Sequence, residues 1–195
     1  MNSLTILQQV CAHFVDIPTE VWEDFSTHWK EVSYKKGDYI TRAGQIERYL
    51  YIVLEGVQRG YVLRDGEEVV LGFAFDHSPS GVPESFLTQQ PTETYLQAMS
   101  DSKLLRIHYD DMQAMYSKYK CIERLGRLMT EQLVVGMLKR QLALVSYTAE
   151  ERYRRLLRES PRTLQLIPQK HLASYLGMKP ETFSRLRKSV KWDSL

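Results

Sequence analysis

Two charged residues, Glu181 and Arg185, lie about one helical turn apart in the basic segment "PQKHLASYLGMKPETFSRLRK", residues 168–188. An arginine can donate two hydrogen bonds to O6 and N7 of guanine, and a glutamate can accept one from N4 of cytosine. Each such contact contributes about 1–3 kcal/mol of discrimination between bases. If the segment is helical, this pair has the chemistry needed to read base edges in a DNA groove.

The segment is typical of two helices joined by a turn. We expect a first helix over Gln169–Tyr175, ended by Gly177 in the left-handed conformation that favours glycine. Pro180 suits the first position of a second helix, where its missing N–H is not needed. The positions expected to face inward are Leu172, Ala173, Leu176, Met178, Phe183 and Leu186. This pattern predicts a helix-turn-helix, and an ordinary helical hairpin remains the alternative.

The outer face of the second helix is predicted to meet DNA. Glu181 and Arg185 occupy the positions expected to read base edges. Five further side chains are better placed for phosphates, which position a protein on the duplex without specifying its sequence: Gln169, Thr182, Ser184, Arg187 and Lys188. Residues 146–195 hold 11 Lys and Arg against 5 Asp and Glu, whereas residues 1–145 hold 15 against 19. A balance of +6 favours a polyanionic partner for this part, although solvated helix faces would give the same count.

The rest of the chain must position this segment. Residues 1 to about 30 are predicted to be helical, with Val21, Phe25 and Trp29 on one face. Short β-branched and aromatic runs follow, with turns at 37–38, 43–44, 55–56 and 65–66 and the last strand ending near Tyr109. Turns at this spacing predict an antiparallel β-sandwich or roll. Fold class α+β is therefore expected.

From about Asp110 to Val145 the sequence is helical in pattern and has no proline. Apolar or small residues recur every seven positions in two series, which favours packing against a partner helix. We predict a parallel helix pair in a homodimer, with a purely intramolecular helix as the alternative. The predicted contact residues are Ile122, Leu125, Leu128, Met129, Val135, Gly136, Leu142 and Ala143, the small ones allowing close approach. After this helix, Thr148 and Glu151 predict a capping box at the start of another.

The sequence lacks the residues that a metal site, an enzyme or a membrane protein would need. The two cysteines, Cys11 and Cys121, form no Cys-x-x-Cys motif, and the five histidines show no paired spacing, so no metal or cofactor site is predicted. Glycine-rich phosphate loops and nucleophile elbows are absent, which disfavours an enzyme such as a metal-dependent cupin. The sequence has no apolar run long enough to span a membrane and no signal peptide, so we expect a cytoplasmic protein without a membrane partner.

Taken together, "YKKGDYITRAGQ", "LYIVLEGVQRGYV" and above all "LASYLGMKPETFSRLRK" resemble the catabolite activator/fumarate–nitrate regulator (Crp/Fnr) family of bacterial transcription factors, and most closely the variant common in Bacteroidetes. The resemblance covers residues 15 to 190. It implies a double-stranded, jelly-roll-like β-roll sensor (1–109), a dimerisation helix (110–145) and a helix-turn-helix domain (146–195). It also implies that Glu181 and Arg185 read bases and that RNA polymerase is a partner. The family often has arginine or serine at the base-reading position of Pro180, and because proline cannot read guanine, we expect the operator to differ at that base pair. Because the segment before Gln169 is short and the chain ends soon after Lys191, we expect any wing to be reduced or absent.

The effector region departs from the family. Cyclic-nucleotide binders carry Gly-Glu-x-x-Leu and Arg-Ser/Thr-Ala around the cyclic phosphate, whereas this chain reads "SGVPESFLTQQPTETYLQA". The corresponding candidate pocket residues are Gly81, Glu84, Ser85, Thr92, Glu93 and Thr94. No lysine or arginine occurs between Arg64 and Lys103, and a buried phosphate needs a cation or several donors. We therefore expect that the chain does not bind cyclic AMP in the usual way and that any small effector is of another kind.

The leading hypothesis is a homodimeric, sequence-specific DNA-binding transcriptional regulator without catalytic residues. A ligand-binding β-roll protein whose helix-turn-helix only packs is the alternative, and a strong salt dependence of DNA binding would distinguish the two.

Overall fold

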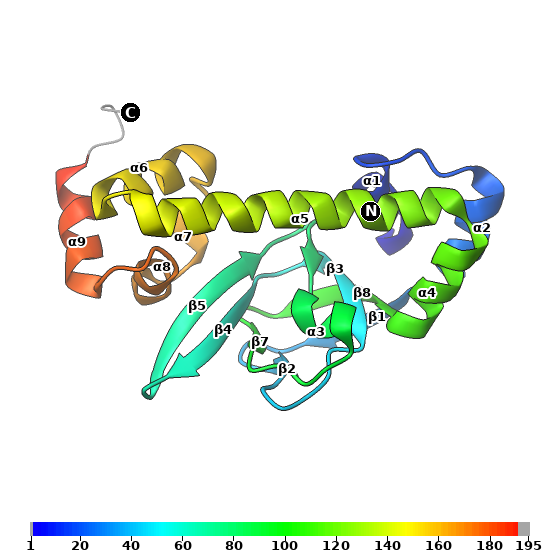
Figure 1. The fold of residues 1–195 in the computed structure, drawn as a ribbon, viewed down its shortest axis with the longest axis horizontal. Helices are drawn as coiled ribbons and strands as arrows, with labels where there is room; N and C mark the ends of the chain where they lie inside the picture. The colour runs from blue at the N-terminus through cyan, green and yellow to red at the C-terminus, as the bar shows by residue number, and fades with distance from the viewer. Residues whose placement is uncertain (1, 191–195) are drawn as a thin grey trace.

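A computed structural model describes residues 2–190 as a two-sheet β-roll, a long helix and a group of short C-terminal helices (Figure 1). The strands are β1 (Lys30–Tyr34), β2 (Tyr39–Thr41), β3 (Tyr49–Glu55), β4 (Gln58–Arg64), β5 (Glu67–Ala74), β6 (Pro79–Ser80), β7 (Tyr95–Ala98) and β8 (Ser102–His108). The helices are α1 (Ser3–Ala12), α2 (Thr19–Thr27), α3 (Pro83–Thr88), α4 (Tyr109–Lys118), α5 (Lys120–Ser146), α6 (Ala149–Glu159), α7 (Thr163–Leu166), α8 (Gln169–Tyr175) and α9 (Pro180–Ser189).

The β-roll consists of two four-stranded antiparallel sheets with the orders β1-β8-β3-β6 and β2-β7-β4-β5. The glycines that predicted turns do form them. Gly56 has φ +110°, and a Cβ added there would lie 2.8 Å from the carbonyl oxygen of Asp101, so only glycine fits. The predicted antiparallel roll, and its end near Tyr109, are confirmed.

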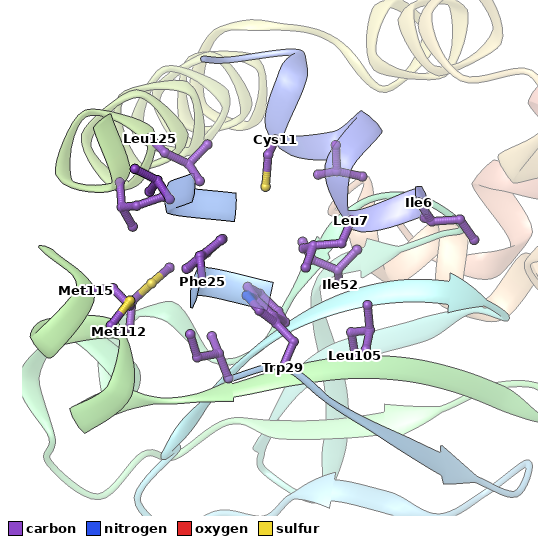
Figure 2. Packing of buried hydrophobic residues seen from close by; sticks show 14 of the residues in the cluster. Ile6, Leu7, Cys11, Phe25, Trp29, Ile52, Leu105, Met112, Met115 and Leu125 are labelled. Atoms are coloured by element: carbon purple, nitrogen blue, oxygen red, sulfur yellow. The ribbon is translucent and has the colours of Figure 1, made fainter. Parts of the chain in front are cut away.

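One face of the roll is covered by the N-terminal helices. Phe25 in α2 and Trp29 just after it pack in a core shared with β3, β8, α4 and α5 (Figure 2). The two rings meet edge to face, 5.8 Å apart between centroids, and Phe25 is fully buried. Burial of these apolar side chains attaches α1, α2 and the first half of α5 to the roll.

The single helix predicted from about Asp110 to Val145 is wrong in one respect. The structure has two helices, because Tyr119 adopts extended backbone angles (φ −132°, ψ 113°) between α4 and α5. The Tyr119 hydroxyl and the Lys118 ammonium both donate to the carboxylate of Asp24, at 2.9 and 2.8 Å. These contacts with α2 are made at the break, so the chain turns there before α5 begins.

Beyond α5 the described residues are helical or irregular, with no strand between Ala149 and Val190. The capping box predicted at Thr148 and Glu151 is confirmed, since each side chain pairs with the other's backbone N–H. The short helix α7 lies between α6 and α8. Residues 191–195, the end of the predicted third domain, lie outside the described residues. None of the described helices is long and apolar enough to cross a membrane.

Candidate nucleic-acid interface and effector site

The turn between α8 and α9 has the geometry that the sequence predicted. Gly177 has φ +62°, and its N–H donates to the Ser174 carbonyl oxygen while the Met178 N–H donates to that of Ala173, each at 3.0 Å. This pair of bonds is the Schellman arrangement that ends a helix. A Cβ at residue 177 would lie 3.0 Å from Cδ2 of Leu144, so the turn also packs tightly on α5.

Helix α9 begins at Pro180, which takes the predicted N-terminal position. Phe183 is fully buried and meets the ring of Tyr153 on α6 edge to face, at 5.3 Å between centroids. The inward-facing side chains form one cluster with α6 and α8: Tyr153, Leu156, Leu157, Ile167, Leu172, Ala173, Leu176, Phe183, Leu186 and Val190. Packing of this cluster fixes which side of α9 faces out.

The outer face of α9 carries the predicted base-reading residues. Pro180, Glu181 and Arg185 are all exposed. Neither Glu181 nor Arg185 has a side-chain hydrogen bond or ion pair with any described residue, so both are available to a partner. Among the predicted phosphate contacts, Gln169, Arg187 and Lys188 are exposed, whereas Thr182 and Ser184 are half-buried.

Helix α5 has an apolar face that this chain leaves uncovered. Val135, Leu138, Leu142 and Val145 are spaced three and four residues apart and are 49, 59, 54 and 80% exposed. Leu128, half-buried, continues the series toward the roll. This spacing is that of a coiled-coil seam.

The predicted contact list for α5 needs correction. Ile122, Leu125 and Ala143 are buried within the chain itself, the first two in the core shared with α1 and α2. Met129 is half-buried and packs on the same core. Gly136 is exposed, but it lines a cleft formed with α6 and α8. One sevenfold series therefore faces its own chain, namely Ile122, Met129, Gly136 and Ala143. The other series lies on the uncovered face and consists of Leu128, Val135 and Leu142.

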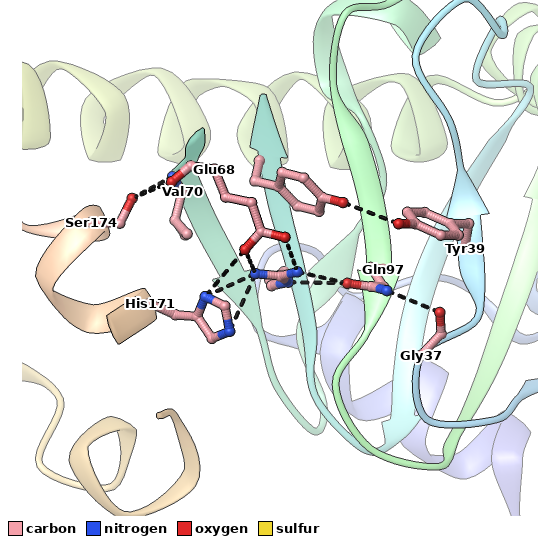
Figure 3. A network of polar contacts seen from close by, with 9 residues as sticks. Gly37, Tyr39, Glu68, Val70, Gln97, His171 and Ser174 are labelled. Carbon is pink, nitrogen blue, oxygen red and sulfur yellow. Dashed lines mark hydrogen bonds and ion pairs between the residues drawn. The ribbon is translucent and has the colours of Figure 1, made fainter. Parts of the chain in front are cut away.

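A polar contact between the roll and α8 was not predicted (Figure 3). Arg59 on β4 is 7% exposed and binds both carboxylate oxygens of Glu68, at 2.6 and 2.8 Å. The same guanidinium lies 2.8 Å from the Oε1 of Gln97 and 2.8 Å from Nδ1 of His171 on α8. The hydrogen bond from Arg59 holds the pKa of Glu68 below its usual range.

His171 accepts rather than donates in this contact, because a guanidinium has no acceptor. Burial, together with the charge of Arg59, lowers the pKa of His171 to about 4, so the imidazole is neutral at pH 7. Its 3.7 Å separation from the Glu68 carboxylate is therefore a contact with a neutral ring and not an ion pair at that pH. No spacing rule links Arg59 to His171, which are 112 residues apart.

Helix α8 also covers the edge of the second sheet. The N–H of Val70 on the edge strand β5 donates to Oγ of Ser174, which in turn donates to the Glu68 carbonyl oxygen, both at 2.9 Å. Arg140 of α5 donates to the carbonyl oxygens of Val70 and Tyr175, at 3.1 and 3.2 Å. Side chains from α8 and α5 thus satisfy backbone groups that an edge strand leaves unpaired.

The predicted effector residues gather around α3 and β7, but their polar side chains already have hydrogen-bond or ion-pair partners within the chain. Glu84 Oε1 accepts hydrogen bonds from the hydroxyls of Thr92 and Thr94, at 2.7 and 3.1 Å. Ser85 accepts from the Glu47 N–H, and Glu93 points outward to pair with Arg64 at 2.5 Å. Gly81 (φ +141°) approaches the Tyr49 backbone, with a hypothetical Cβ 3.5 Å from its carbonyl oxygen.

Glu47 is a buried carboxyl that sequence patterns did not identify. It is 2% exposed and lies beside the candidate effector residues. It accepts hydrogen bonds from the Thr41 hydroxyl and from the Tyr49 N–H, the latter at 3.0 Å. Desolvation outweighs these bonds and raises the pKa of Glu47 to about 7.

The remaining titratable residues give no sign of a metal or redox site. No group of three His, Cys, Asp or Glu in the described part of the chain could hold a metal ion. Burial raises the pKa of Cys11 to about 12, which suppresses the reactive thiolate form. Cys121 is half-buried.

The chain combines a two-sheet β-roll, a long helix and short C-terminal helices, and known proteins share this arrangement. Residues 31–119 match the family described as cyclic nucleotide-binding domain. Similar solved structures include FixK2 from Bradyrhizobium japonicum (22% identity over 82% of this chain and 83% of that one, TM-score 0.74). The catabolite activator protein of Thermus thermophilus shares 22% identity over 92% and 85% of the chains, with TM-score 0.57. A Crp/Fnr-family protein from Eubacterium rectale shares 18% over 89% and 83%, with TM-score 0.67.

These comparisons confirm the resemblance predicted from the sequence: most of the roll matches the cyclic nucleotide-binding domain family, and the fold is similar to solved structures that include a Crp/Fnr-family regulator. Among curated proteins none matches the sequence.

Proposed function

We propose that this protein is a homodimeric regulator that binds specific DNA sequences through α9. The observation that carries the proposal is the outer face of this helix, where Glu181 and Arg185 are exposed and unpaired while Phe183 and Leu186 anchor the other face. An α-helix presented in this way fits the major groove and meets bases with its N-terminal half. In this reading α8 and α9 form a helix-turn-helix.

The uncovered face of α5 supports a dimer. A stripe at seam spacing, with Leu138 and Val145 more than half exposed, is unfavourable in water and would be buried by a parallel second copy. Two copies joined there would carry two recognition helices, which suits a palindromic site with half-sites one helical turn apart. A DNA-bound dimer of this kind would act with RNA polymerase, as the family resemblance implies.

The roll is proposed to sense an effector other than cyclic AMP bound in the family's usual way. Support comes from Glu84, whose carboxylate already satisfies the hydroxyls of Thr92 and Thr94 at the place where the family binds the cyclic phosphate. A phosphate there would have to displace this carboxylate without help from a lysine or arginine in residues 65–102. Micromolar binding of cyclic AMP in calorimetry would contradict the proposal.

Selection of binding sites from random duplex DNA, using the purified chain without added ligand, tests DNA recognition. We expect a palindrome, and a preference at one base pair that Arg185→Ala relaxes at a cost of about 1–3 kcal/mol. Lys188→Ala is the matched control, because loss of a phosphate contact weakens binding to all sequences about equally. If both variants behave alike, the assignment of base and phosphate contacts is wrong.

A further inference from the structure

A cleft with a volume of about 320 Å³ lies between α5, α6 and the C-terminal end of α8. Four cationic side chains line it, namely Lys139, Arg140, Arg152 and Arg155, against the single carboxylate of Glu159. Arg155 already pairs with Glu159, at 2.9 Å. The cleft is therefore strongly positive, and most of its charge lacks a counter-charge within the described chain.

Two of these guanidinium groups are held in place without being neutralised. Arg140 donates to the Val70 and Tyr175 carbonyl oxygens and lies 4.8 Å from the centre of the Tyr175 ring. Arg152 donates to the carbonyl oxygens of Tyr147 and Gly177. Neither has a carboxylate partner among residues 2–190. Backbone carbonyls orient these cations but leave their charge uncompensated.

Both groups also have a buried donor that is unused. The Nε atoms of Arg140 and Arg152 are inaccessible and have no hydrogen-bond partner. Buried donors are rarely left unpaired, because the loss of their water costs about 1–3 kcal/mol each. Both side chains that line the cleft therefore have hydrogen-bonding capacity and charge that no described residue satisfies.

We propose that this cleft binds a small ligand through a phosphate or diphosphate group. Guanidinium groups are suited to phosphate oxygens, which accept several charge-assisted hydrogen bonds at once. The cleft has four cationic side chains and one carboxylate. A multiply charged anion balances this excess of positive charge better than a ligand with one carboxylate group. The proposal concerns a site between the long helix and the C-terminal helices, outside the roll, and it stands whether or not α9 reads DNA.

The DNA backbone offers the same phosphate chemistry but fits the cleft less well. No residue of α9 lines the cleft, whereas Arg155 and Glu159 from the C-terminal half of α6 do, together with its C-cap Ser160. The ligand would instead bridge α5 and α6 across the bend at Tyr147 and Thr148. If the proposed function holds, occupancy of the site would set the angle at which α9 is presented.

Calorimetric titration of the full chain with pyrophosphate tests the site. We expect saturable binding of one pyrophosphate per chain, weakened about tenfold by Lys139→Gln, which removes one charge-assisted contact. Lys139 is exposed and unpaired in the described chain, so this variant should fold normally. Lys120→Gln, at the opposite end of α5, is the matched control and should bind like the wild type.

The Nε–H signals of arginine in a nitrogen–proton correlation spectrum locate the ligand directly. Pyrophosphate should shift the signals of Arg140 and Arg152. The signal of Arg106 should stay unchanged, because its Nε is also buried and unpaired but lies in the roll. Absence of binding at millimolar pyrophosphate, or equal binding by Lys139→Gln, overturns the proposal. Displacement of pyrophosphate by duplex DNA of random sequence, with the same two signals moving, would assign the cleft to the DNA backbone and also overturn it.

Discussion

Replacement of Glu47 by glutamine should make the protein more stable at alkaline pH. Glu47 is buried, and its pKa is raised from 4.5 to about 7. An acid whose pKa is higher in the folded state stabilises the fold when protonated, and this contribution is lost as the pH rises through the folded pKa. Glutamine has the shape of the protonated acid: its carbonyl oxygen can accept from the Tyr49 N–H, and its amide N–H can donate to the Thr41 hydroxyl oxygen.

The magnitude follows from the two pKa values. With 4.5 in the unfolded chain and about 7 in the folded one, the contribution of Glu47 falls by about 2.5 kcal/mol between pH 5 and pH 8. His171 acts in the opposite direction, since its folded pKa of about 4 lies below the ordinary 6.5. Its contribution is present above pH 6.5 and is lost as the pH falls toward 4. The two titrations offset each other in the wild-type protein.

Urea unfolding at pH 5 and pH 8 measures the effect as the difference between Glu47→Gln and wild type, in which His171 cancels. We expect this difference to change by about 2.5 kcal/mol in favour of the variant at pH 8. A difference that stays the same at both pH values would show that Glu47 titrates normally and would refute the reasoning. His171→Asn is the companion variant and should give a change of opposite sign between pH 4 and pH 7.

Three further changes test the fold. Leu138→Ala removes a side chain that is 59% exposed in one copy. Its loss from both copies should weaken a dimer by roughly 2–3 kcal/mol, or roughly 30- to 150-fold, as measured by sedimentation equilibrium. An unchanged association constant would place the interface elsewhere. Gly177→Ala should lower the free energy of unfolding by about 1 kcal/mol or more because of its positive φ and the nearby Leu144, whereas Gly136→Ala, with open space at its Cβ in a helix, should raise it by up to about 1 kcal/mol. Ser174→Ala should cost about 1–3 kcal/mol, since it leaves the Val70 N–H unpaired, and an equal cost for the exposed helical Ser117→Ala would argue against that cause.

Local patterns in the sequence predicted local structure well. Gly177, Pro180, Thr148 and Glu151 act within a few residues of themselves, so their types alone define the turn and the caps. The break at Tyr119 was missed because it coincides with contacts to Asp24, a residue 95 positions away. A helical pattern in the sequence contains no information about a contact with a distant carboxylate.

Contacts between the roll and the C-terminal helices could not be predicted for the same reason. Arg59, Glu68 and His171 meet only after three segments have folded, and each is ordinary in its local context. The sevenfold series on α5 was ambiguous because a helix buries one face on its own chain and exposes another. Only the structure shows that Val135 and Leu142 are uncovered while Ile122 is buried.

The cover that α8 gives to β5 makes the roll dependent on the C-terminal helices for its solubility. Without Ser174 and Arg140, the N–H and C=O of Val70 and the C=O of Glu68 would be unpaired backbone groups on the edge strand of a sheet. Such an edge is a template for strands of other molecules. A truncated roll, or a chain whose C-terminal helices have swung away, should therefore be prone to edge-to-edge aggregation, and the intact arrangement protects the chain against it.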